Sequence, residues 1–111
     1  MKKYYYSFGY HSPSAWDVMK ADPEFDFESC GVFEIEAESS SAAKLWGEEL
    51  AKWYIEKLFA ENLAYVWSPK NYGCSVEENL PSGWESAIGL LGGIRYRNYP
   101  DFYKVKNAFN D

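Results

Sequence analysis

Apolar and polar residues alternate in two stretches of the chain, a pattern typical of strands with one buried face. The first stretch, residues 2–10, places four aromatic rings on one side: Tyr4, Tyr6, Phe8 and Tyr10. The second stretch, residues 31–38, places three apolar residues on one side: Phe33, Ile35 and Ala37. Its other side carries three carboxylates: Glu34, Glu36 and Glu38. The two patterns predict two strands that bury their apolar sides in one core.

Helical spacing follows the second strand. Serines at 39–41 supply a helix start, and apolar residues then recur every three or four positions. The stripe consists of Ala43, Trp46, Leu50, Trp53, Tyr54 and Leu58. This pattern predicts one long amphipathic helix over about residues 40–62, with its Trp-rich face across the sheet.

A shorter helix is expected between the two strands. Ser12 is a good N-cap, and Pro13 suits the first helical position because its missing N–H has no helical partner there. Pro23 disfavours helical geometry in the residue before it, so this helix should end near Asp22. The following segment "PEFDFES" is expected to be a loop or an edge.

The second half of the chain has weaker signals. We expect strands at 63–67 and 72–76 around a turn, and a short helix over 82–91 that Gly92 and Gly93 end. Residues 94–99 alternate again and predict a further strand. The tail from Asp101 fits either a last strand or a docked segment.

This order of elements predicts an α+β fold in a single domain over residues 1–111. We expect a mainly antiparallel sheet of about four to five strands. The long helix and one or two short helices should pack on it. Aromatic residues form 20% of the chain, which indicates a core rich in rings.

Charge is distributed unevenly along the chain. The formal net charge of −6 argues against direct nucleic-acid binding, which needs clustered Lys and Arg. Residues 17–38 hold eight carboxylates and one lysine, whereas residues 94–106 hold four basic residues and one acid. The chain therefore has an acidic segment and a smaller basic one.

Recognisable catalytic and cofactor motifs are lacking. His11 is the one histidine, and a lone histidine just after a strand is typical of a surface or capping residue. The sequence around Cys30 and Cys74 does not indicate an activated thiol. Zinc-ligand spacing and a phosphate loop are both missing. The alternating acids of residues 22–28 lack the glycine that a calcium loop needs at its sixth position. We expect no enzyme activity, no metal and no cofactor.

The sequence also bears on the compartment. It contains no apolar run of 18 residues and no secretion signal at the N-terminus. We therefore expect a soluble cytoplasmic protein, without a membrane partner, whose two cysteines are reduced.

The acidic segment has two explanations. Carboxylates on one strand face can be a solvated surface, or can protect an edge from aggregation. They can also attract a cationic partner, for which Phe25 and Phe27 would be anchors. On the second explanation the contact residues are Asp22, Glu24, Phe25, Asp26, Phe27, Glu28, Glu34, Glu36 and Glu38.

The hypothesis that follows is a small acidic protein-binding module that inhibits or neutralises a basic protein, such as a nuclease or another nucleic-acid-binding protein. In size and charge alone the chain resembles toxin immunity proteins and phage anti-defence inhibitors. One alternative is an enzyme or small-ligand domain with an aromatic pocket that includes Tyr4, Tyr6 and Trp46. Another is a self-associating structural module, in which Arg95 and Arg97 meet the acidic face of a second copy. The sequence leaves the oligomeric state open.

Overall fold

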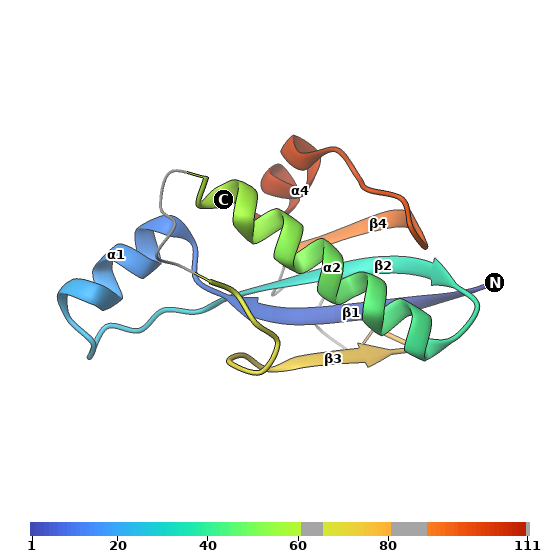
Figure 1. The fold of residues 1–111 in the computed structure, drawn as a ribbon, viewed down its shortest axis with the longest axis horizontal. Coiled ribbons are helices and arrows are strands. Elements are labelled where there is room, and N and C mark those ends of the chain that lie inside the picture. Colours follow the sequence, from blue (N-terminus) through green and yellow to red (C-terminus); the bar gives the residue numbers. More distant parts are fainter. Residues whose placement is uncertain (61–65, 81–88, 111) are drawn as a thin grey trace.

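The computed structural model describes residues 1–60, 66–80 and 89–110. Their elements, in chain order, are β1 (Lys2–Tyr10), α1 (Pro13–Ala21), β2 (Ser29–Ala37), α2 (Ser40–Leu58), β3 (Cys74–Glu77), β4 (Gly89–Arg95) and α4 (Phe102–Phe109). The predicted α+β class is confirmed, and the described residues form one four-stranded sheet, within the expected four to five strands (Figure 1). Most of the strand predicted at 63–67, and of the helix predicted at 82–91, lies outside the described residues.

The sheet has the strand order β3-β1-β2-β4. β1 runs antiparallel to both β2 and β3, whereas β4 runs parallel to β2. In the register of the central pair, Tyr6 lies opposite Phe33 and Phe8 lies opposite Gly31. The sheet is therefore mixed, with its two longest strands at the centre.

The core lies on the face of the sheet that α2 and α4 cover (Figure 1). All four aromatic residues predicted to face the core from β1 are buried. The ring of Phe8 lies at the centre, with centroid distances of 5.4 Å to Phe33, 5.5 Å to Tyr10 and 5.9 Å to Phe109. The expectation of a ring-rich core is confirmed.

α2 begins where the serines predicted, because the Ser39 side chain accepts the N–H of Ala42 at 3.1 Å. It ends at Leu58, four residues before the predicted end. Its tryptophans do not lie across the sheet: Trp46 and Trp53 are only half-buried and both pack on Tyr99. The helix instead meets the sheet at Gly47, where a Cβ would come within 2.3 Å of the Tyr6 ring. A small residue is required there, so the bulky indoles lie at the sides.

The second half of the chain contains the main corrections. Gly89 to Gly93, expected to be the end of a helix, belong to β4, because pairing with β2 overrides the local signal of the glycines. Trp67 is not in a strand but is buried, and its indole N–H donates to the carbonyl of Gly9 at 3.0 Å. The undecided tail is a helix, α4, because the Asp101 side chain caps its first turn.

α1 agrees with its prediction. The Ser12 side chain accepts the N–H of Ala15, Pro13 occupies the first turn, and the helix ends at Ala21. The chain then returns towards β2 through an irregular segment, residues 22–28, at the end of the molecule that holds α1 (Figure 1). Within the described residues, no helix combines the length and the apolar character needed to cross a membrane.

Candidate functional site

The predicted contact residues fall into two separate groups. Asp22 to Glu28 form the irregular segment beside α1, here called the acidic loop, whereas Glu34 and Glu36 lie within β2. Glu38 follows the far end of β2 and is exposed. Because a strand rises about 3.3 Å per residue, the length of β2 separates Glu38 from the loop by roughly 30 Å. The residues do not form one continuous acidic surface.

The strand carboxylates have cationic and polar neighbours within the sheet. Glu36 pairs in register with Lys3 on one side and Arg95 on the other, and the Nε of Arg95 is 3.7 Å from its Oε2. The Oε1 of Glu34 lies 3.9 Å from the Nζ of Lys3 and accepts the N–H of Gly93 at 3.4 Å. These neighbours offset the repulsion expected between the strand carboxylates.

Two further observations agree with this pairing. Only 19% of the Glu34 side chain is exposed, and burial together with the Glu34 carboxylate raises the pKa of the Tyr5 hydroxyl above its ordinary value. Arg95, which the self-association alternative needs, lies beside β2 of its own chain. The acidic and basic segments of one chain therefore contact each other where β2 pairs with β4.

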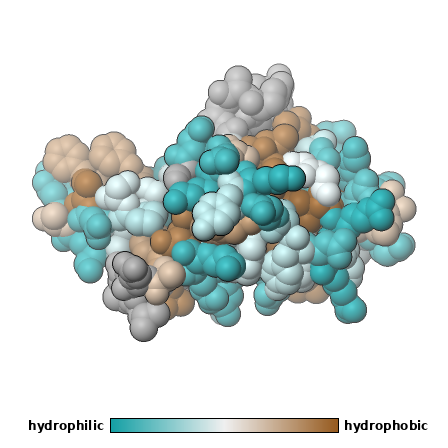
Figure 2. Space-filling view, turned by 90° about the horizontal axis from the view of Figure 1, so that it is seen from above, coloured by the Kyte–Doolittle hydropathy of each residue, from teal (hydrophilic) through white to brown (hydrophobic). Residues whose placement is uncertain are grey.

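The acidic loop is different, because it carries an uncovered aromatic pair. Phe25 is 51% exposed and Phe27 is 61% exposed. Their rings stack on each other, with centroids 6.3 Å apart and planes at 25°. In the space-filling view, the end of the molecule that holds α1 carries apolar side chains at its surface (Figure 2). The two rings contact each other and lie outside the core.

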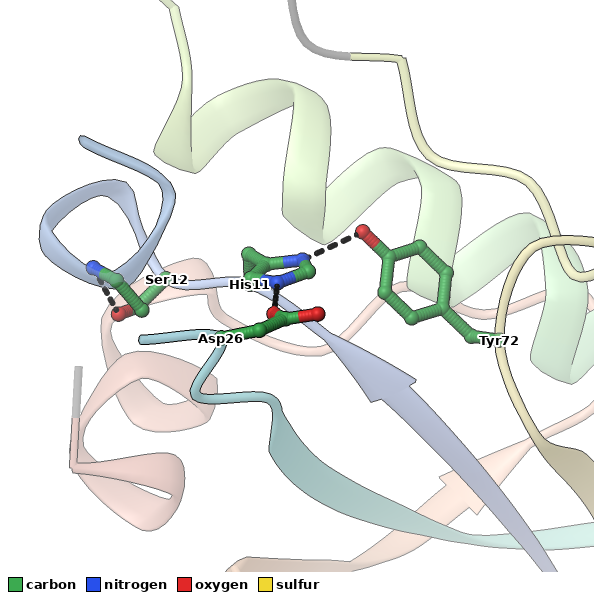
Figure 3. A network of polar contacts seen from close by, with 5 residues as sticks. His11, Ser12, Asp26 and Tyr72 are labelled. Atoms are coloured by element: carbon green, nitrogen blue, oxygen red, sulfur yellow. Dashed lines mark hydrogen bonds and ion pairs between the residues drawn. The ribbon is translucent and has the colours of Figure 1, made fainter. Parts of the chain in front are cut away.

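One of the acids that alternate with these rings contacts His11. Asp26 accepts a hydrogen bond from Nε2–H of His11, and the Tyr72 hydroxyl lies 2.8 Å from Nδ1 (Figure 3). The Trp16 ring meets the imidazole edge-on at 5.5 Å. His11 is only 5% exposed, so the interpretation of this histidine as a surface or capping residue is wrong. α1 and the acidic loop fold back over the end of β1 and enclose it.

The cluster has a defined chemical capacity. One ligand atom each from His11, Asp26 and Glu28 lie within 4.8 Å of one another, and these donor types can hold a divalent cation. The sequence contained only a faint signal of this cluster, namely one histidine and acids at alternate positions 15 and 17 residues later. Regular metal-ligand spacing does not reveal the cluster, because the loop rather than a helix or hairpin brings the groups together.

The two thiols lie apart from this chemistry. Cys30 pairs in register with Gly9 and Cys74 with Phe8, so they lie on opposite faces of the sheet and two strand spacings apart, about 10 Å. That separation is too great for a disulfide, and both cysteines are free. Burial raises the pKa of both thiols above the ordinary value, which disfavours a reactive thiolate. Both ring nitrogens of His11 contact oxygen atoms, so the structure gives no support to a Cys–His dyad.

The three residues of the alternative aromatic pocket are packed against other parts of the chain. Tyr4 and Tyr6 are buried in the core, and Trp46 directs its indole N–H to the carbonyl of Asn98 at 3.1 Å. One depression of the described surface lies instead between β4 and residues 98–104, where charged and polar groups form much of its lining. These three aromatic residues are therefore part of the packing.

Comparison of the chain with protein-family models, with curated proteins and with solved structures finds no match in any of the three. The features that bear on its function are therefore those of the acidic loop: the exposed Phe25–Phe27 pair and the cluster of Asp26 and Glu28 with His11.

Proposed function

We propose that this protein is a small cytoplasmic protein-binding module that docks on a basic protein through its acidic loop, and that it acts by binding and not by catalysis. The observation that carries the proposal is the stacked, exposed pair of Phe25 and Phe27 among carboxylates. Aromatic side chains that a partner can enclose supply a large share of binding energy at protein interfaces. Two adjacent phenylalanines in an otherwise polar loop fit that role.

Charge complementarity supports a basic partner. Residues 17–28 contain five carboxylates and one lysine, a formal charge of −4 at one end of the molecule. A field of one sign accelerates encounter with a cationic surface and disfavours acidic partners. The aromatic pair then supplies the apolar contact that holds the complex, because charge at an interface rim adds more to association rate than to affinity.

The strand carboxylates have a smaller part in this proposal than the sequence suggested. Glu34 and Glu36 already lie beside Lys3 and Arg95, so a partner would have to compete with those neighbours. Reversing both charges to lysine would also disturb the sheet itself. The acidic loop is therefore the better place for mutations that test binding.

The proposed class of partner is a nuclease or another protein with a cationic nucleic-acid-binding surface. Such a surface is built to attract phosphates, and carboxylates presented beside it can compete for the same cations. Occupying it would inhibit the partner. This role corresponds to toxin immunity or to inhibition of a defence nuclease.

The test begins with affinity capture of basic proteins from the native host and continues with the purified partner. The double variant Phe25→Ala/Phe27→Ala should weaken binding by about 100-fold or more, mainly through faster dissociation, because interface anchors contribute roughly 2 kcal/mol or more each. Surface plasmon resonance at two salt concentrations gives both rates. Glu24→Gln should slow association, and more at low salt than at high salt.

Leu45→Ala is the matched control, since Leu45 is also an exposed apolar residue but lies on α2. It should bind like the wild type. Equal affinity of the wild type and the double phenylalanine variant would contradict the proposal. So would a loss of affinity that is as large for Leu45→Ala.

A further inference from the structure

We propose that His11, Asp26 and Glu28 form a binding site for a single zinc ion. The inference does not depend on the protein-binding role, because Phe25 and Phe27 are not among the three ligands. Three observations carry it: the burial of His11, the contact of Tyr72 with Nδ1, and the convergence of two carboxylates near Nε2.

The Tyr72 contact prepares His11 to be a ligand. Metal-binding histidines usually donate the N–H of their other ring nitrogen to an oxygen atom, which fixes the tautomer and the ring orientation. The Tyr72 oxygen is 2.8 Å from Nδ1 and can accept that hydrogen bond. In the metal-bound form the ring proton resides on Nδ1 and the lone pair of Nε2 binds the metal, whereas in the present structure Nε2 donates its N–H to Asp26. When zinc binds, the proton on Nε2 is displaced and passes through solvent to Nδ1, so the zinc-bound imidazole stays neutral.

The carboxylates come from one short segment and reach the same point. Asp26 already contacts Nε2, and the donor atoms of all three residues lie within 4.8 Å of one another. Donor atoms on a tetrahedral zinc are roughly 3.3 Å apart for bonds of about 2.0 Å. Glu28 is exposed, so a small rotation of its side chain closes the remaining distance.

The donor set selects the metal. One imidazole nitrogen and two carboxylate oxygens suit zinc, whereas calcium prefers six to eight oxygen ligands and magnesium keeps mostly water and oxygen ligands. Among first-row divalent ions, zinc also binds nitrogen and oxygen sites more tightly than manganese or iron. Two carboxylates balance the charge of the ion. Three protein ligands leave a fourth position for water or for a group from another molecule.

The experiment is a zinc titration of the full chain, freed of metal, by isothermal calorimetry without any partner protein. The wild type should bind one equivalent. Glu28→Gln removes an exposed ligand and leaves the contacts of His11 intact, so it tests the site without the risk of unfolding; it should weaken binding at least tenfold. Tyr72→Phe should weaken binding by about tenfold, the lower end of the effect expected when a histidine loses its orienting partner.

Glu24→Gln is the matched control, because Glu24 is a carboxylate of the same loop that lies outside the cluster. It should bind zinc as the wild type does. Absence of saturable binding by the wild type would overturn the proposal, and so would equal weakening by Glu24→Gln and Glu28→Gln, which would indicate diffuse attraction to the loop. Phe25→Ala/Phe27→Ala should bind zinc normally, so this measurement and the test of partner binding can fail independently.

Discussion

Two stacked pairs of phenylalanines lie in this molecule in opposite surroundings. Phe8 and Phe33 stack at 5.4 Å in the core and are wholly buried, whereas Phe25 and Phe27 stack at 6.3 Å and are more than half exposed. The first pair is covered by α2 and α4. The second pair has polar residues around it in the sequence and receives no such cover. The same chemical contact stabilises the fold in one place and offers a surface in the other.

The carboxylates show a parallel difference. In β2, Glu36 lies between Lys3 and Arg95 of the neighbouring strands and Glu34 contacts Lys3. The carboxylates of the acidic loop lie instead at the end of the molecule that holds the exposed rings and His11. A run of acidic residues in the sequence therefore does not always give an unpaired acidic surface in the structure. Sheet pairing decides which of the acids remain available to another molecule.

The largest expected difference comes from truncating one ring in each pair. Phe33→Ala leaves a cavity among Phe8, Phe109 and the central strands, and should lower the free energy of unfolding by about 3–5 kcal/mol. Phe27→Ala removes an exposed ring and should change it by no more than about 0.5 kcal/mol. Urea denaturation measures both. A loss above about 2 kcal/mol for Phe27→Ala would mean that the outer pair also supports the fold.

The next test uses pH to show how firmly the core excludes charge. Burial raises the pKa of the Tyr6 hydroxyl above its ordinary value of 10.0. Above that pH the unfolded chain loses the proton while the folded chain keeps it, so stability falls as pH rises. The slope for this residue approaches about 1.4 kcal/mol per pH unit.

Tyr6→Phe keeps the ring and removes the ionisable group. The variant should therefore lose less stability than the wild type between pH 10 and 11, as measured by urea denaturation at each pH. Tyr103→Phe, which removes an exposed hydroxyl, is the matched control and should follow the wild type. Identical alkaline slopes for the wild type and Tyr6→Phe would contradict the prediction.

The smallest expected effect concerns the two groups of carboxylates. Glu34→Gln weakens the attraction to Lys3 and should lower the free energy of unfolding by about 0.5–1 kcal/mol, with a smaller difference at high salt. Glu24→Gln relieves repulsion in the acidic loop, and should leave stability unchanged or slightly higher. Thermal unfolding at about 20 mM and about 500 mM salt distinguishes the two variants, since salt screens the attraction between charges much more strongly at the higher concentration. A salt-independent loss for Glu34→Gln would contradict a role through charge, because the Gln amide oxygen can still accept the N–H of Gly93.

The elements with strong local signals could be predicted from the sequence. Alternation identified β1 and β2, and Ser12, Pro13 and Ser39 correctly marked the starts of two helices. The errors arose where a distant partner decides the outcome. Gly89 to Gly93 resemble the end of a helix but pair with β2, and the indoles of α2 are displaced to its sides because Gly47 must approach Tyr6.

The candidate site also depends on partners that are distant in the sequence. Phe25 and Phe27 are candidate anchors because acids alternate with them; both are exposed in the structure, and their role in binding stays a prediction. The pairing of Glu36 with Arg95 depends on a parallel contact between segments 59 residues apart, which periodicity does not reveal. The environment of His11 depends on the return of the acidic loop and on Tyr72, 61 residues away. These contacts are properties of the tertiary fold.

The strand order also has a consequence for synthesis on the ribosome. β1 and β2 are complete within the first 37 residues, but both of their outer neighbours, β3 and β4, come from residues 74–95. Until those residues emerge, the central pair of strands has unpaired backbone groups along both edges, and such edges are templates for association with other chains. We expect the nascent protein to be most vulnerable to aggregation in this interval, and completion of the sheet to end it.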